Sequence, residues 1–354
     1  MTQTSPYPVR AGLTILPERD DTGQTTHRGN GGSHVVQQFR DILVYAEFND
    51  AACLAQVVDI AAAHGAAITV CEIVEPAPRK HDPRGVIERV SKLRWSLAFQ
   101  RLRRICDHFS DHTVIDYSVF TGVPFVTITE QVLQQDFDLV VHISERVQES
   151  TGIGLNATGM HLMRKCPCTV WAMHPQRPAE SANVLLALDR ELADETTTAE
   201  AFAITLAESA VALAAARGGE LHVIHAWRPY GYELLETSEL ALKKGELDFY
   251  RKQQRRDSEQ WFKRIKQRIE SIAPEELVVH AQLVEGSPVP VVQQAVTETA
   301  AGMLVLGTVG TSANPGVLIG ATTESILTGC GTSVLALKPP GFVSPLMLAR
   351  PANL

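Results

Sequence analysis

The chain has 354 residues, of which 45% are hydrophobic and 20% are charged, and its formal net charge is −8. This length and composition are typical of two globular domains with hydrophobic cores. The acidic balance, uninterrupted by any Lys/Arg-rich run, argues against nucleic acid as a partner.

Residues 1–38 are rich in Thr, Gly, Asp and Gln, show no hydrophobic period, and contain no apolar run long enough for a secretory signal. We expect them to form a flexible arm. The longest apolar stretches elsewhere look strand-sized, so we expect no membrane span and no membrane partner. Six cysteines without a disulfide-type spacing indicate buried thiols and a reducing, cytoplasmic location. The four expected to be small buried side chains are Cys53, Cys71, Cys106 and Cys330.

Order is expected to begin with a short apolar strand at Asp41–Tyr45, after which helical and strand-like segments alternate. The elements expected next are helices at Ala51–His64 and Gly85–Phe109 and strands at Ala67–Val74, Thr113–Val119, Leu139–Ile143 and Thr169–Met173. The second helix is amphipathic, and its apolar face is formed by Val90, Leu93, Leu97, Leu102 and Ile105. The alternation predicts a doubly wound α/β fold with a parallel sheet covered on both faces.

After a short linker at Pro175–Ala179 the same order is expected again. The counterparts are strands at Val184–Leu188, Glu220–Ala226, Met303–Leu306 and Ser333–Leu337 and helices at Ala199–Arg217 and Leu240–Ile272. We therefore expect a first domain at 39–175, a second domain at 182–340 and a C-terminal tail at 341–354. Each domain is expected to contain five parallel strands.

Identical residues recur at one constant offset, which supports a domain duplication. The pairs separated by 164 positions are Gly122 and Gly286, Pro124 and Pro288, Cys166 and Cys330, Val170 and Val334, and Ala172 and Ala336. Near the first strands the offset is smaller, since Ile42 and Val184 are 142 positions apart. We expect an insertion of 22 residues, the difference of 164 and 142, between the second and fourth strands of the second half, in the charged helix 240–272.

The second half contains a spaced-glycine pattern directly after its fourth strand. Gly307 and Gly310 are followed by nine residues, Gly320 and a short helix. Glycines leaving a parallel strand allow a ligand to approach the backbone, and a helix N-terminus attracts phosphate. Ligands of open α/β sheets bind at the carboxyl ends of the strands. The pattern is consistent with a phosphate cradle, although glycines after strands are often simple turns.

The Gly-x2-Gly-x9-Gly pattern after the fourth strand of a five-stranded α/β domain resembles the ATP-binding class of universal stress protein domains. The segments Met160–Trp171, Leu304–Gly310, Gly320–Glu324 and Leu337–Pro339 carry this resemblance, which covers residues 38–342 and the tandem-domain branch of the family. It implies two domains related by a pseudo-two-fold axis that pack through their last strands, as separate subunits of the family do when they dimerise.

The resemblance also implies a binding site for adenine nucleotide, ATP with or without Mg²⁺, in the second domain alone. The residues carried over by position are Asp189, Ala226, Gly307, Gly310, Gly320, Thr322 and Thr323. Two positions depart from the family pattern: Ala321 replaces a hydroxyl residue and Thr311 replaces a basic one. Both changes are expected to lower affinity, with Thr322 and Thr323 substituting for the missing hydroxyl.

The first half is expected not to bind a triphosphate in this manner. Subtracting 164 from the three glycines gives Ile143, Arg146 and Asn156, none of which is glycine. The branched side chain of Ile143 lies where the backbone would have to approach the ligand. Gly152 and Gly154 in the same loop have a different spacing.

These features predict a stress-response protein that binds ATP in its second domain and acts through an unknown protein partner. A nucleotide-independent interaction scaffold and a slow ATPase remain as alternatives. No catalytic constellation and no Walker-type lysine is found, so no catalytic residue is assigned. The stress, the pathway and further dimerisation stay open.

No metal site is assigned either. Cys166-Pro-Cys168 is interpreted as packing and not as half of a metal site, because no matching Cys/His pair has zinc spacing. His108 and His112 are interpreted as a solvated helix end. His222 and His225 lie on a strand expected to be buried, where His225 either faces the nucleotide crevice or is a hydrogen-bonded core histidine.

Overall fold

The computed structural model describes most of the chain between residues 39 and 348. The described ranges are 39–46, 51–78, 84–109, 113–143, 147–149, 152–173, 181–190, 197–232, 234–235, 243–308 and 319–348. The expected arm at 1–38, the linker Pro175–Ala179, Arg146 and Gly310 lie outside these residues.

Helices and strands alternate through both halves of the chain, as the hydrophobic pattern predicts. The first half contains β1 (Asp41–Ala46), α1 (Ala51–His64), β2 (Ala67–Val74), α2 (Val86–Asp107), β3 (Ile115–Thr121), α3 (Pro124–Gln135), β4 (Leu139–Ile143), β5 (Val147–Glu149), β6 (Gly152–Gly154), α4 (Ala157–Lys165) and β7 (Thr169–Met173). The second half contains β8 (Val184–Leu188), α5 (Thr197–Arg217), β9 (Leu221–Trp227), α6 (Lys244–Ile272), β10 (Val279–Glu285), α7 (Pro288–Glu298), β11 (Met303–Gly307), α8 (Ala321–Thr328), β12 (Ser333–Leu337) and α9 (Pro345–Leu348).

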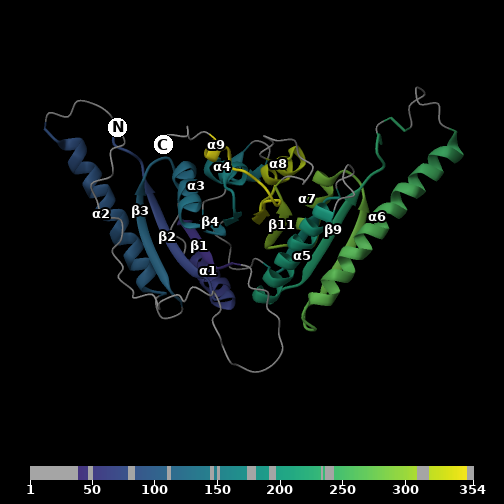
Figure 1. The fold of residues 1–354 in the computed structure, drawn as a ribbon, viewed down its shortest axis with the longest axis horizontal. Coiled ribbons are helices and arrows are strands. Elements are labelled where there is room, and N and C mark those ends of the chain that lie inside the picture. The colour runs from purple at the N-terminus through teal and green to yellow at the C-terminus, as the bar shows by residue number, and fades with distance from the viewer. Residues whose placement is uncertain are drawn as a thin grey trace.

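Ten of the strands form one continuous sheet in the order β10-β9-β8-β11-β12-β7-β4-β1-β2-β3. Within each half the pairing is parallel, and the first strand lies between the second and the fourth, as a doubly wound sheet requires. The two halves meet where β12 pairs antiparallel with β7, so the expected packing through the last strands is confirmed. Figure 1 shows the halves side by side, with α2 and α6 at the outer edges.

The register at this junction is symmetric. Leu335 pairs with Trp171, Val334 with Ala172, and Ala336 with Val170. Trp171 and Leu335 occupy equivalent positions, since they are 164 residues apart. A pseudo-two-fold axis therefore passes between them, and each half presents the same edge to the other.

Each face of the sheet has a hydrophobic core that runs through both halves. Helices α1, α2, α5 and α6 cover one face, and their core includes Val57, Leu102, Leu206 and Ile265. Helices α3, α4, α7 and α8 cover the other face. The four cysteines expected to be small buried side chains are buried in these cores.

The insertion in the second half is divided between two crossovers, which corrects the expected single location. Strand pairing makes Ile42, Ile68 and Ile115 the counterparts of Val184, Leu221 and Val279. The offset is 142 for the first pair, 153 for the second and 164 for the third. One half of the extra length therefore precedes the second strand, where α5 has 21 residues and α1 has 14. The identities that define the offset of 164 all lie after the third strand of each half. They therefore could not show that the insertion has two parts.

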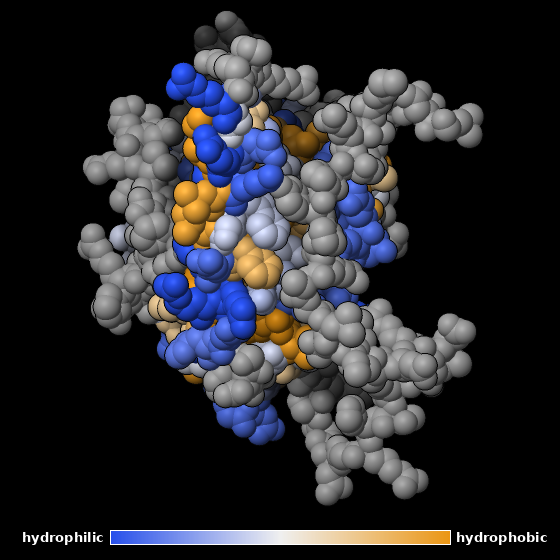
Figure 2. All heavy atoms as spheres, turned by 90° about the vertical axis from the view of Figure 1, so that its left-hand side faces the viewer, coloured by the Kyte–Doolittle hydropathy of each residue, from blue (hydrophilic) through white to orange (hydrophobic). Residues whose placement is uncertain are grey.

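Helix α2 packs one face on the core, as predicted, but three of the five apolar residues expected on that face are exposed. Leu102 is buried and Ile105 packs against the core, but Val90, Leu93 and Leu97 are 51%, 59% and 44% exposed. At 100° per residue, these three exposed side chains lie on the opposite side of α2 from the face that packs on the core, which carries Trp95, Ala98, Phe99 and Leu102. Figure 2 shows hydrophobic side chains among hydrophilic ones on this side of the molecule.

Helix α5 is the second departure from expectation, because its apolar stretch is longer than a strand. Residues Ala199–Arg217 are long and apolar enough to cross a membrane by length and composition, among the described residues. Half of the stretch is buried, and α5 packs against β8, β11, α1 and α6. These contacts are those of a core helix lying between the sheet and its neighbours.

Replacing Trp171 with Ala should destabilise the whole chain, because this fully buried side chain lies at the junction of the two halves. We expect the free energy of unfolding to fall by about 3–5 kcal/mol, the usual cost of a large cavity. Urea denaturation followed by circular dichroism measures it. Trp95→Ala is the matched control, since Trp95 lies on α2 and is partly exposed. Equal losses in the two variants would show that the junction has no special role in stability.

Candidate functional site

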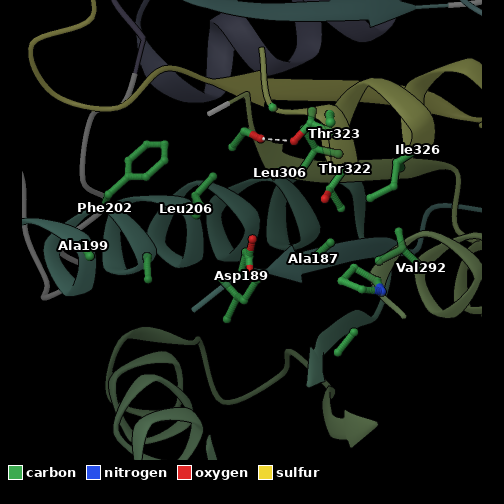
Figure 3. Close-up of a pocket in the computed structure, with 17 residues that line it drawn as sticks. Ala187, Asp189, Ala199, Phe202, Leu206, Val292, Leu306, Thr322, Thr323 and Ile326 are labelled. Atoms are coloured by element: carbon green, nitrogen blue, oxygen red, sulfur yellow. Dashed lines mark hydrogen bonds between the residues drawn. The ribbon is translucent and has the colours of Figure 1, made fainter. Parts of the chain in front are cut away.

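The described residues of the second half enclose a cavity of about 160 Å³ at the carboxyl ends of its central strands. It is bounded by the ends of β8 and β11, by Ala226 on β9, and by helices α5, α7 and α8. Figure 3 shows side chains from these elements around the hollow. This is the position at which open α/β sheets bind ligands.

Asp189 follows β8 directly, is exposed, and lines the cavity. In Figure 3 its carboxylate and the hydroxyl of Thr322 approach the hollow from opposite sides. Asp189 is the one acidic residue among the described residues that line the cavity, and no Lys or Arg is among them. The described wall therefore offers one negative charge and otherwise depends on backbone and hydroxyl groups.

The strand end that presents Asp189 is held by a buried histidine. His225 Nδ1 lies 3.0 Å from the carbonyl oxygen of Leu188, and the ring packs against Trp261 and Phe262. Burial lowers the pKa of His225 to about 4, so the ring is neutral at physiological pH. Of the two sequence interpretations of His225, the hydrogen-bonded core histidine is confirmed.

Two of the three glycines of the motif lie in the described part of the chain, and each has a structural role. A Cβ on Gly307 would approach Phe202 Cε1 to 2.9 Å, so the glycine allows α5 to pack closely on the end of β11. The N–H of Gly320 donates to the carbonyl oxygen of Thr308 at 2.8 Å. Gly320 is the N-cap of α8, and no side chain among the described residues caps this helix.

The two threonines expected to replace the missing hydroxyl differ in their contacts. Thr323 Oγ1 donates to the carbonyl oxygen of Gly307 at 3.1 Å and joins α8 to β11. Thr322 is exposed and faces the cavity in the first turn of α8 (Figure 3). Glu324 in the same turn pairs with Arg164 of α4, which neutralises a carboxylate near the helix N-terminus.

Six of the seven residues expected at the site therefore line one cavity, and Gly310 lies outside the described residues. Sequence reasoning did not identify the apolar wall formed by Phe202, Leu206 and Ala187. The repeat could have identified Ala187, because the offset of 142 aligns this small residue with the much larger Tyr45 of the first half.

The equivalent place in the first half is filled by side chains. Tyr45, the counterpart of Ala187, is buried and stacks on His142, with ring centroids 5.5 Å apart. His142 is the counterpart of Leu306 and is fully buried. Asn156, the counterpart of Gly320, caps α4 by accepting a hydrogen bond from Gly159 N at 2.8 Å. The first half thus occupies this space with two rings and closes the helix N-terminus with its own side chain.

The remaining candidate residues lie away from the cavity. Cys166 is buried in a core and its Sγ lies 3.5 Å from Cys168 Sγ. Lys338 of the second half donates a hydrogen bond to the carbonyl oxygen of Met163, and burial lowers its pKa to about 8. His108 is exposed at the end of α2, and His112 lies outside the described residues.

Comparison with known proteins finds a family match for the half of the chain that contains the cavity. Residues 183–338 match the model of the universal stress protein family. Universal stress protein E of Salmonella typhi is 26% identical over 233 residues, which are 65% of this chain and 70% of that protein. Universal stress protein E of Escherichia coli K12 is 25% identical over the same length and the same shares of both chains.

Solved structures share the fold. A functionally unknown protein from Pseudomonas aeruginosa PAO1 superposes with a TM-score of 0.56 at 20% identity, covering 87% of this chain and 95% of that one. A universal stress protein from Archaeoglobus fulgidus superposes with a TM-score of 0.55 at 15% identity, covering 85% of this chain and 99% of that one.

A doubly wound five-stranded unit used twice, with a cavity at the strand ends of the second unit, defines a tandem α/β protein. The matches narrow the class: residues 183–338 match the universal stress protein family, and the chain is similar to universal stress protein E.

The neutral, buried His225 should make the protein sensitive to acid. The unfolded chain binds a proton near pH 6.5, whereas the folded chain binds it near pH 4. The contribution of neutral His225 to the free energy of unfolding is therefore complete above pH 6.5. As the pH falls from 6.5 to 4, this contribution is lost at about 1.4 kcal/mol per pH unit. Urea denaturation at a series of pH values should show a shallower slope for His225→Gln than for wild type. His108→Gln, at an exposed position, should keep the wild-type slope. Parallel slopes for all three proteins would contradict the assignment.

Proposed function

We propose that this chain is a stress-response protein that binds an adenine nucleotide, ATP with or without Mg²⁺, in the cavity of its second half. The first half does not bind a nucleotide in the same manner, and the protein acts through contacts with a protein partner. The cavity between Asp189 and the N-terminus of α8 is the observation that carries this proposal.

The N-terminus of α8 supports a phosphate position. A helix N-terminus presents backbone N–H groups and a partial positive charge to an anion. Because Gly320 has no side chain, nothing from the cap residue stands between these groups and the hollow. The hydroxyl of Thr322 adds a hydrogen-bond donor on the same side.

Asp189 supports the opposite end of the ligand. A carboxylate at the end of a first strand is well placed to accept hydrogen bonds from a ribose or to ligate a Mg²⁺ that accompanies the phosphates. The buried contact between His225 and Leu188 holds this strand end in place. The apolar wall of Phe202, Leu206 and Ala187 offers a surface on which an adenine ring can pack.

The contrast with the first half supports a single site per chain. Tyr45 and His142 occupy the space that Ala187 and Leu306 leave open, and Asn156 caps the helix that corresponds to α8. A nucleotide in the first half would have to displace two stacked rings and a capping bond.

An interaction scaffold that binds no nucleotide is the second candidate. The close packing of Gly307 on Phe202 favours it, because this contact explains one motif glycine without any ligand. A slow ATPase has less support. No Lys or Arg lines the described cavity, and phosphoryl transfer requires the developing charge to be neutralised.

Exchanging the cap residues of α8 and α4 tests the site directly. Gly320→Asn should weaken ATP binding by about tenfold or more, because the new side chain would accept the helix N–H groups as Asn156 does. The variant should fold normally, since Gly320 has φ −70° and ψ 143° and its Cβ would make ordinary contacts. Calorimetric titration of ATP and Mg²⁺ measures the affinity, and thermal unfolding measures the fold.

The reverse exchange, Asn156→Gly, is the matched control. It should lower stability by a few tenths of a kcal/mol and leave ATP binding unchanged. Wild-type affinity in a folded Gly320→Asn variant would exclude the N-terminus of α8 as the phosphate position. If the wild-type protein binds no ATP and carries no nucleotide after purification, the interaction scaffold is the better description.

A further inference from the structure

Three metal-ligating side chains meet at the end of the sheet opposite the cavity. Glu220 precedes β9, His222 is the second residue of β9, and His280 is the second residue of β10. One ligand atom of each lies within 4.8 Å of the others. The cavity lies at the carboxyl ends of the strands and this cluster at their amino ends, so the two are separate features of one half.

The sheet itself sets the distance between the two histidines. His222 and His280 are directly paired on neighbouring parallel strands. Their side chains therefore leave the sheet on the same face, at the spacing of adjacent strands. The rings stack with centroids 4.8 Å apart and planes 16° apart. Ligands on paired strands are held more firmly than ligands on loops.

Glu220 completes the cluster. Its Oε2 lies 3.2 Å from His280 Nε2 and 3.4 Å from His222 Nε2. The backbone of Glu220 is anchored on both sides: its N–H donates to Asn183 Oδ1, and its carbonyl oxygen accepts from Val184 N. One carboxylate oxygen thus faces both imidazole nitrogens from a fixed position.

His222 is the most buried member of the cluster, and its Nε2 is poorly hydrogen-bonded. The side chain of His222 is 16% exposed, and its Nε2 is buried without a hydrogen bond of acceptable geometry among the described residues. Its contact with Glu220 Oε2 at 3.4 Å falls short of a good hydrogen bond, and a bound ion would satisfy both atoms. Glu220 and His280 are about half exposed, so an ion and a water molecule can reach the cluster from solvent.

We propose that Glu220, His222 and His280 form a binding site for Zn²⁺ or a similar late first-row divalent ion. Two imidazoles and one carboxylate are ligands that these ions accept, whereas Mg²⁺ and Ca²⁺ prefer oxygen alone. Ligand atoms around a tetrahedral Zn²⁺ are about 3.3 Å apart, close to the two distances from Glu220 Oε2. Three protein ligands leave the fourth position to water.

Sequence spacing alone does not reveal this site. His222 and His280 are 58 positions apart, with the whole of α6 between them, and strand pairing brings them together. No metal site is therefore expected from the sequence, in which His222 lies on a strand expected to be buried.

Titration of the full-length protein with Co²⁺ and Zn²⁺, after removal of bound metal with a chelator, tests the proposal. We expect one Co²⁺ per chain with visible absorption typical of nitrogen and oxygen ligands, and displacement of Co²⁺ by Zn²⁺. His280→Gln should lower the affinity by roughly tenfold or more. Glu220→Gln, which replaces one oxygen, should weaken binding while preserving the size of the side chain.

Two control variants separate this site from other metal-binding groups. His108→Gln removes an exposed histidine elsewhere, and Cys168→Ser removes one thiol of the Cys166–Cys168 pair. Both should bind Co²⁺ as wild type does. Unchanged affinity in a folded His280→Gln variant, or no binding by wild type, would overturn the proposal. A thiolate charge-transfer band that disappears in Cys168→Ser would do the same, by moving the metal to the cysteine pair.

Discussion

The antiparallel pairing of β7 with β12 is the contact on which the rest of the structure depends. It joins two five-stranded sheets into one, and the hydrophobic cores on both faces run across it. Polar contacts reinforce it on the face that α4 and α8 cover: Lys338 donates to the carbonyl of Met163, Ser344 donates to that of Lys165, and Arg164 pairs with Glu324. The last turn of α4 is therefore bound to the C-terminal part of the second half.

The two halves share one fold but carry different side chains at equivalent positions. At the carboxyl ends of the strands, Ala187 and Gly320 leave a hollow in the second half. Tyr45 and Asn156 close the corresponding place in the first half. At the amino ends, paired strands of the second half bring His222 and His280 together. Side-chain size at equivalent positions thus determines whether the carboxyl ends of the strands enclose a cavity.

Much of the fold follows from the sequence because strands in a parallel sheet are buried on both faces. Such strands read as continuous apolar runs, and β2, β4, β7, β8 and β12 begin and end at the expected residues. Helix α1 ends at His64, as expected, because Gly65 adopts φ 65°, a conformation that favours glycine.

What the sequence did not reveal depends on contacts between distant residues. Leu93 is exposed because the face of α2 that packs on the core carries Trp95 and Phe99, and apolar residues on both faces of the helix make its hydrophobic periodicity ambiguous. The order of residues in the candidate site was predictable from the family pattern, whereas the wall formed by Phe202 depends on how α5 packs against β11. The pairing of His222 with His280 depends on strand register, which is set by the whole sheet.

Joining both halves in one polypeptide changes how their association responds to the amount of protein. Two separate subunits held by a β7–β12 type of contact would dissociate on dilution, by mass action. Here the partner edge is always present at the effective concentration set by the linking chain, so the contact does not depend on how much protein a cell makes. Every molecule then contains one half with a cavity and one half in which Tyr45 and His142 fill the equivalent place. Exchange of subunits cannot change this one-to-one ratio.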